Sequence, residues 1–247
     1  LGITGMLGHT LFKEMNKNEL FDVFGTTRSI KGLDEYFTVE ELQSIRANVD
    51  ADNFDTVIRA IAGVQPTIII NCIGIIKQLP ISNDPLTAIN VNAELPHRIS
   101  LVARSANARL IHISTDCVFN GKKGKYTEDD SSDAEDLYGR TKFLGEVSYP
   151  HCVTLRTSII GHELKTNFSL ADWFMSQEGG INGFTKAIYS GFPTVEMVNI
   201  ISNYIIPNKK LSGLYHVSSN AISKYDLLNI IKDTYKKDIK INVFDDF

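Results

Sequence analysis

Short apolar runs rich in valine and isoleucine alternate with amphipathic stretches through the first two thirds of the chain. The clearest run spans residues 67–73 and is far too short to cross a membrane. Runs that are apolar at nearly every position are typical of parallel strands covered on both faces. The preceding stretch, 53–62, has helical periodicity and places four apolar side chains on one face: Phe54, Val57, Ile58 and Ile61. This alternation predicts an α/β fold, a doubly wound parallel sheet covered by helices.

Three glycines, Gly2, Gly5 and Gly8, precede the helical stretch 9–15 at three-residue spacing. Glycines allow a strand to turn tightly into a helix, a pyrophosphate to approach the backbone, and the helix to pack closely on the sheet. The spacing differs from the usual G-x-G-x-x-G motif, so a merely flexible amino terminus is the alternative. Because a helix pattern follows at once, we favour a Rossmann-type cofactor site whose turn also contains Thr4, Met6 and Leu7.

The other segments extend the same pattern. We expect strands at 21–26, 67–73, 109–114, 153–160 and 213–218, and helices at 53–62, 85–105, 137–147, 167–177, 195–206 and 224–236. The alternation becomes irregular after residue 160. The sequence therefore predicts an NAD(P)-binding domain in residues 1–160, with its first strand partly cut off, and a smaller mixed α/β portion in residues 161–247 for substrate binding. We expect that second portion to be partly interleaved with the first and incomplete at its carboxyl end.

The ends of the expected strands indicate the cofactor. Arg28 stands where NAD-binding proteins carry an acid for the ribose 2′-hydroxyl, and an arginine can pair with the 2′-phosphate of NADP. NADP is therefore preferred over NAD, with a solvated loop residue as the alternative role for Arg28. Asp50 is expected near the adenine. The cofactor is also expected to approach the end of the fourth strand, at Asn71, Cys72, Ile73 and Gly74, although Asn71 could equally cap a turn.

A strand end and a helix start carry the catalytic pattern. Thr115 closes the fifth strand after Ile113 and Ser114, which we expect beside the cofactor. Tyr138 and Lys142 are four residues apart and share one face of the next helix. An ammonium beside a phenol lowers the phenol pKa, so that Tyr138 could exchange a proton near neutral pH while Thr115 holds the same oxygen. A surface Tyr–Lys pair is the alternative, but Tyr138 alone among the nine tyrosines has lysine at this offset.

These residues resemble the dTDP-4-dehydrorhamnose reductase family of extended short-chain dehydrogenases. The resemblance is carried by residues 114–121, 126–128 and 138–146, with weaker similarity at 90–93, 155–158, 167–168, 191–194 and 213–217. It implies that Thr115, Tyr138 and Lys142 are catalytic and that Gly2, Gly5 and Gly8 form the glycine loop. It also implies that Asn90 lines the active site from a helix, and that Thr157 and Ser158 border the nicotinamide.

The implied activity is NAD(P)H-dependent reduction of the 4-keto group of a nucleotide-linked deoxysugar for surface polysaccharide synthesis. Two departures leave the sugar open: Cys117 replaces the usual tyrosine, and residues 73–78 replace an Ala- and Thr-rich stretch. The candidate substrate contacts are Lys77, Thr115, Asp116, Cys117, Asn167 and Lys186.

Two other functions remain open. An NAD-dependent epimerase or dehydratase would retain its cofactor through a full cycle, and Asp116 could be its acid, although Cys117 is a poor partner for that acid. A non-catalytic, NADP-binding regulatory subunit could use the same fold, because fold does not determine function. The intact Thr115, Tyr138 and Lys142 argue against the regulatory role.

Composition limits the partners. The net charge of −4 over 247 residues gives no basic excess for a nucleic acid or a membrane surface. No apolar run is long enough to span a membrane, and the amino terminus does not look like a signal peptide. The three cysteines, Cys72, Cys117 and Cys152, lack metal-binding spacing, so no metal is expected. We expect a cytoplasmic protein that binds a nucleotide sugar and could form a homodimer.

Overall fold

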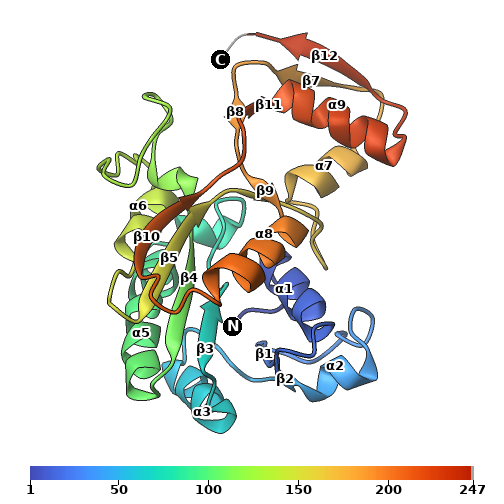
Figure 1. Ribbon diagram of the computed structural model, residues 1–247. Coiled ribbons are helices and arrows are strands. Elements are labelled where there is room, and N and C mark those ends of the chain that lie inside the picture. Colours follow the sequence, from blue (N-terminus) through green and yellow to red (C-terminus); the bar gives the residue numbers. More distant parts are fainter. Residues whose placement is uncertain (246–247) are drawn as a thin grey trace.

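A parallel sheet forms the centre of the computed structural model, which describes residues 1–245 (Figure 1). Four strands pair in the order β10-β5-β4-β3, and every pair is parallel. Their bounds are β3 Ile68–Asn71, β4 Arg109–Thr115, β5 Cys152–Thr157 and β10 Gly213–Val217. Ile70 lies opposite Ile111 and Ile113 lies opposite Leu155. The predicted α/β class with a parallel sheet is confirmed.

Residues 1–3 connect this sheet to a second pair of strands, β1 (Gly25–Thr26) and β2 (Ile45–Arg46). The α-amino group of Leu1 donates to the Ile70 carbonyl at 2.7 Å, and the Cys72 N–H donates to the Leu1 carbonyl at 3.1 Å. On the other side, the Ile3 N–H donates to the Thr26 carbonyl at 3.1 Å. The order across the molecule is therefore β2, β1, residues 1–3, β3, β4, β5 and β10. Ligands of doubly wound sheets bind where the strand order reverses, here between residues 1–3 and β3.

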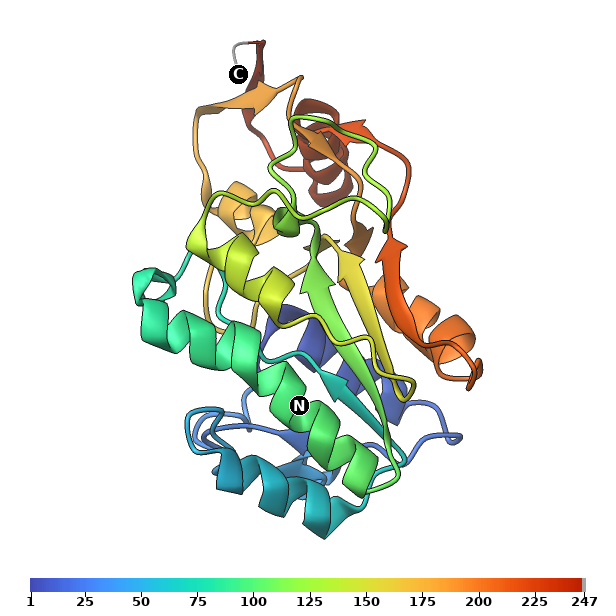
Figure 2. The same cartoon turned by 90° about the vertical axis from the view of Figure 1, so that its left-hand side faces the viewer.

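Helices cover both faces of the sheet (Figures 1 and 2). The helices α3 (Phe54–Val64) and α5 (Leu95–Ser105) pack on one face, whereas α1 (Met6–Asn16) and α8 (Thr194–Ile200) pack on the other. Successive residues of β4 serve the two cores, because Leu110 joins the α3–α5 cluster and Ile111 joins the α1–α8 cluster. Both side chains are fully buried, and each such burial contributes about 1.5–3 kcal/mol to stability.

The long helix expected at 85–105 is continuous but changes its pitch. It begins as α4 (Pro85–Ala88), passes through the π-helical turn η2 (Ile89–Glu94) and continues as α5. The helix α8 likewise ends in a π-helical turn, η4 (Ile201–Ile205). The remaining short elements are α2 (Val39–Gln43), η1 (Pro80–Asn83) and η3 (Asp116–Val118). A π-helical turn fits an extra residue into the helix and changes which side chains face inward.

Several predicted elements are longer in our expectation than in the structure. The strand expected at 67–73 is Ile68–Asn71, and the helix expected at 167–177 is Leu170–Ser176. The strand expected at 21–26 is confined to Gly25–Thr26, which pairs with Ile45–Arg46. The helix expected at 137–147 is α6 (Leu137–Leu144), which ends at Gly145.

After residue 160 the chain leaves the sheet and later returns to it. The helices α7 (Leu170–Ser176) and α9 (Lys224–Tyr235) lie at the top of Figure 1 with the parallel strands β7 (Gly180–Phe184) and β12 (Lys240–Phe244). We call these four elements the upper layer. Two short pairs join it to the sheet region, β6 (Ile159–Ile160) with β9 (Phe192–Pro193) and β8 (Ile188–Tyr189) with β11 (Ile222–Ser223). The segment between β9 and β11 returns to the central sheet, where it forms α8 and β10.

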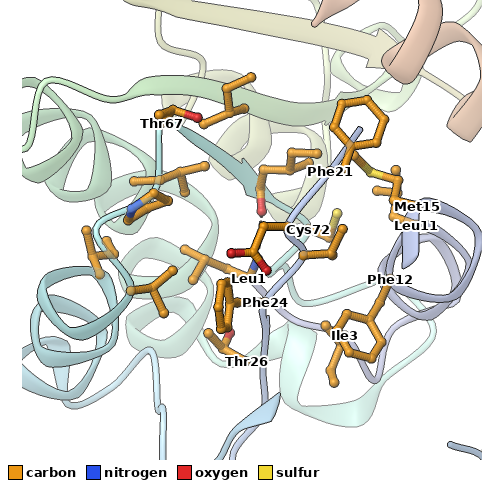
Figure 3. A pocket seen from close by; sticks show the side chains of 18 of the residues that line it. Leu1, Ile3, Leu11, Phe12, Met15, Phe21, Phe24, Thr26, Thr67 and Cys72 are labelled. Carbon is orange, nitrogen blue, oxygen red and sulfur yellow. Dashed lines mark hydrogen bonds between the residues drawn. The ribbon is translucent and has the colours of Figure 1, made fainter. Parts of the chain in front are cut away.

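An apolar cavity of about 360 Å³ opens beside residues 1–3. Figure 3 shows its aliphatic and aromatic lining, which includes Leu11, Phe12, Met15, Phe21 and Phe24. None of Thr115, Tyr138 or Lys142 lines it, whereas the predicted cofactor residues Gly8 and Cys72 do. Within residues 1–245, no helix is both long and apolar enough to cross a membrane.

Candidate active site

Thr115 is held at the carboxyl edge of the sheet by the turn that follows it. It is the last residue of β4 and caps η3, where its hydroxyl accepts a hydrogen bond from the Cys117 N–H at 3.1 Å. The same hydroxyl donates to the Asp116 carboxylate at 3.2 Å. These two bonds fix the position of the hydroxyl at this edge of the sheet.

Helix α6 lies directly against this turn. Its cap, Asp136, accepts a hydrogen bond from the Gly139 N–H at 2.7 Å. A Cβ atom on Gly139 would lie 2.2 Å from the Cys117 carbonyl oxygen, so only glycine permits the approach. The approach brings Tyr138 beside Thr115, whose hydroxyl interacts with the phenol.

The pKa of Tyr138 is raised well above its ordinary value near 10. Burial is the main cause, the nearby acidic groups of Cys117 and Asp116 raise the pKa further, and the Thr115 hydroxyl opposes them. The lowered phenol pKa that we expected from Lys142 is therefore wrong for this structure, because desolvation outweighs every favourable contact. At neutral pH Tyr138 is a neutral phenol, which can donate a proton.

Lys142 is buried beneath the site. Its ammonium donates to the Ile113 carbonyl at 2.8 Å. Burial lowers the pKa of Lys142 to about 8, while the acidic groups of Glu146 and Cys72 act in the opposite direction. Lys142 therefore carries its charge at neutral pH and loses it in mildly alkaline solution.

An asparagine on the π-helical turn η2 lies on the other side of Lys142. Asn92 is buried, accepts from the Ile75 N–H at 2.8 Å and donates to the Ile75 carbonyl at 3.1 Å. A Cβ atom on Gly74 would lie 3.5 Å from the Asn92 amide oxygen and 3.9 Å from the Lys142 nitrogen, which places all three together. Asn90, which the family resemblance had suggested, points elsewhere and donates to Asp52 at 2.7 Å. The residue at the site is thus Asn92.

A buried ion pair supports the same region, and sequence reasoning missed it. The Arg156 guanidinium donates two hydrogen bonds to the Glu146 carboxylate, both at 2.8 Å. Ser114 donates to the same carboxylate at 2.8 Å. The signal in the sequence was Glu146 itself, which follows Lys142 by four residues and lies just beyond the end of α6.

The glycine turn fits the pyrophosphate of a dinucleotide. A Cβ atom on Gly8 would lie 2.1 Å from the Gly2 carbonyl oxygen, so α1 packs directly on the segment 1–3. Gly5 caps α1 without a side-chain hydrogen bond, and the first turn holds no acidic residue. The first N–H groups of an 11-residue helix, those of Met6, Leu7 and Gly8, thus point toward a site suited to an anion. Thr4 is exposed in the same turn, whereas the Leu7 side chain is buried in the core.

The other predicted cofactor residues lie near the strand ends, and several of them make hydrogen bonds within turns. Arg28 is exposed directly after β1, and Asp50 accepts from the Asp52 N–H at 3.2 Å in a turn. Asn71 accepts from the Ile73 N–H at 3.1 Å and lies 3.2 Å from the His112 ring, so the turn-capping alternative describes it. Cys72 and Ile73 continue toward Gly74, and Ser158 follows the buried Thr157 at the end of β5.

The predicted substrate residues fall into two groups. Asp116 and Cys117 are exposed on η3 beside Tyr138, and Lys77 forms an ion pair with Asp136, the cap of α6, at 2.7 Å. Asn167 and Lys186 are exposed in loops beyond residue 160, and neither side chain makes a hydrogen bond within residues 1–245. The first group therefore surrounds the candidate site, and the second is not connected to it by any contact of the described residues.

Comparison with known proteins identifies the family. The family model described as the RmlD substrate binding domain matches residues 1–243. The chain belongs to this family. The dTDP-4-dehydrorhamnose reductase of Aggregatibacter actinomycetemcomitans is 26% identical over 243 residues, which cover 94% of this chain and 76% of that protein. Methionine adenosyltransferase 2 subunit beta of Danio rerio is also 26% identical, over 248 residues that cover 95% of this chain and 72% of that protein.

A solved structure shares the fold of this RmlD-family chain. It is the dTDP-4-dehydrorhamnose reductase of Bacillus anthracis in complex with NADP, with a TM-score of 0.76 and 21% identity, covering 99% of this chain and 83% of that one. The predicted family, the Rossmann-type fold and the class of NAD(P)-dependent oxidoreductase are confirmed.

Proposed function

We propose that this chain reduces the 4-keto group of a nucleotide-linked deoxysugar with a nicotinamide cofactor. The observation that carries the proposal is the convergence of Thr115, Tyr138 and Lys142 at the carboxyl edge of the sheet. The N-terminus of α1 lies at the reversal of strand order, where a dinucleotide would bind.

The roles follow from the chemistry of the side chains. The bound cofactor would supply the hydride. Tyr138 would give its proton to the carbonyl oxygen, and its raised pKa ensures that the proton is present at neutral pH. The Thr115 hydroxyl would orient that oxygen, and Lys142 would bind the nicotinamide ribose. Asn92 and Gly74 would border the same ribose, and residues 4–8 would bind the pyrophosphate.

We propose NADP as the preferred cofactor and NAD as the alternative. Arg28 follows β1 without an acidic residue beside it, which suits the 2′-phosphate of NADP. The Bacillus anthracis reductase, which has this fold, binds NADP.

Assaying NADPH oxidation against dTDP- and UDP-linked 4-keto-6-deoxysugars, dTDP-4-dehydrorhamnose among them, tests the proposal. We expect turnover with at least one of these substrates, and a higher kcat/KM with NADPH than with NADH. Protein without the sugar nucleotide is the control for background oxidation. Tight NADPH binding without turnover of either substrate would contradict the proposal.

A regulatory role is the second candidate, because a relative of similar identity is named as the beta subunit of methionine adenosyltransferase 2. In that role the chain would bind a methionine adenosyltransferase and change its activity. Co-purification with such an enzyme, together with absence of 4-ketosugar reduction, would favour this candidate. The convergence of Thr115, Tyr138 and Lys142 supports catalysis instead.

The pH profile gives a further prediction. Lys142 is charged below its pKa of about 8, so kcat/KM should fall as the pH rises through that value. Glu146 raises the pKa of Lys142, and Glu146→Gln should therefore move this alkaline limb to lower pH. The Arg156 charge remains buried in that variant, so its folding is checked by circular dichroism before the profiles are compared. An alkaline limb at the same pH in both proteins would contradict the role of Glu146.

A further inference from the structure

A second buried phenol lies beside the candidate site, on a strand that follows residue 160. Tyr189 ends β8 and is paired with Ile222 of β11. Its hydroxyl oxygen is buried and has no hydrogen-bond partner within residues 1–245. An unpaired buried hydroxyl costs roughly 1–3 kcal/mol of folding free energy. A polar atom retained at that cost indicates a function other than stability.

The neighbours of this hydroxyl connect it to the catalytic turn. Thr115 and Thr157 are paired in the sheet, so Asp116 and Ser158 follow neighbouring strand ends. The Ser158 side chain lowers the pKa of both Asp116 and Tyr189 without making a hydrogen bond to the Tyr189 hydroxyl. The charge of Asp116 in turn raises the pKa of Tyr189 and that of Tyr138. Asp116 is therefore close to both phenols, and it directly follows Thr115.

The backbone keeps the Tyr189 hydroxyl in this place. The Phe192 N–H donates to the Ser158 carbonyl at 3.0 Å, which ties the two strands together. A Cβ atom on Gly191 would lie 2.4 Å from the Tyr189 hydroxyl and 2.1 Å from the Ser158 carbonyl oxygen. Close packing thus positions the phenol and covers its hydroxyl, so a sugar hydroxyl reaches it only when the segment 189–191 shifts.

We propose that Tyr189 is a substrate-binding residue whose hydroxyl, with Ser158 and Asp116, binds a ring hydroxyl of the sugar next to the reacting carbonyl. This proposal rests on the proposed function, because it takes the ligand to be a nucleotide sugar. Tyr138 remains the proton donor, because Tyr138 shares a helical face with Lys142 and is the phenol beside Thr115. It would instead supply a contact to the sugar from the part of the chain beyond residue 160.

The test compares Tyr189→Phe with the wild-type protein and with Tyr204→Phe, a control whose side chain is 66% exposed on η4. The first measurement is equilibrium binding of dTDP-glucose and UDP-glucose to the NADPH-loaded protein, which requires no turnover. We expect Tyr189→Phe to weaken nucleotide-sugar binding about 5- to 10-fold, as for the loss of one hydrogen bond. NADPH affinity should be unchanged, and Tm should be equal or higher because an unpaired hydroxyl has been removed. With a 4-keto substrate, KM should rise by a similar factor while kcat changes little.

Unchanged nucleotide-sugar affinity in Tyr189→Phe would overturn the proposal, as would wild-type protein that binds neither probe. A lower Tm with unchanged affinity would assign Tyr189 a structural role. Wild-type protein that binds a probe but reduces no 4-ketosugar would contradict the proposed reaction alone. In that case the binding comparison still decides the role of Tyr189.

Discussion

Tyr138→Phe is expected to lower kcat/KM for the sugar nucleotide by about 1,000-fold, because it removes the proton donor and keeps the ring. Thr115 remains bonded to Asp116 and the Cys117 N–H, and Lys142 remains bonded to the Ile113 carbonyl. The NADPH dissociation constant should therefore stay within about twofold of the wild-type value. Steady-state NADPH oxidation and a fluorescence titration of NADPH measure the two quantities separately.

The matched control is again Tyr204→Phe, which removes an exposed phenol and should leave both quantities unchanged. If Tyr138→Phe retained more than about a tenth of the wild-type kcat/KM, Tyr138 could not be the proton donor. A parallel loss of NADPH binding would instead indicate that the substitution had disturbed the cofactor site.

Gly8→Ala is expected to damage both folding and cofactor binding. The added Cβ would lie 2.1 Å from the Gly2 carbonyl oxygen, so α1 would have to move away from the segment 1–3. Overpacking of this kind costs about 1–3 kcal/mol, and the displaced helix N-terminus would no longer face the pyrophosphate correctly. We expect a lower Tm and at least a roughly 10-fold weaker NADPH affinity by titration.

Gly63→Ala provides the matched control for this change. Gly63 lies in α3, is exposed, and has no atom within 4 Å of an added Cβ. Alanine there should raise stability by about 0.5–1 kcal/mol through its higher helix propensity and should not alter NADPH affinity. If Gly8→Ala and Gly63→Ala had the same effect on Tm and on NADPH affinity, close packing at Gly8 would not be needed for cofactor binding.

Local patterns in the sequence predicted much of the fold and the centre of the site. Apolar runs located β3, β4, β5 and β10, since buried parallel strands need apolar residues on both faces. The four-residue offset placed Tyr138 and Lys142 on one helical face, which requires no knowledge of the rest of the chain.

The features that were missed depend on contacts between distant segments. Asn90 and Asn92 are two residues apart, and the π-helical turn η2 decides which of them faces Lys142. A pattern based on 3.6 residues per turn does not reveal that change of pitch. The lowered pKa expected for Tyr138 failed for a similar reason, because the desolvation that raises it comes from several elements packed together. Tyr189, for which we propose a contact to the sugar, lies on a strand 51 positions beyond Tyr138.

Under the proposed function, the path of the chain after residue 160 limits how sugar preference can change. Residues 161–193 and 218–245 build the upper layer and its connections, while α8 and β10 between them complete the central sheet and its helical cover. Recombination that exchanged residues 161–245 as one block would also replace β10, the edge strand of the sheet, and α8, which packs on α1. New specificities on this scaffold should therefore arise by stepwise substitution at positions such as Cys117 and Tyr189, with the interwoven backbone kept intact.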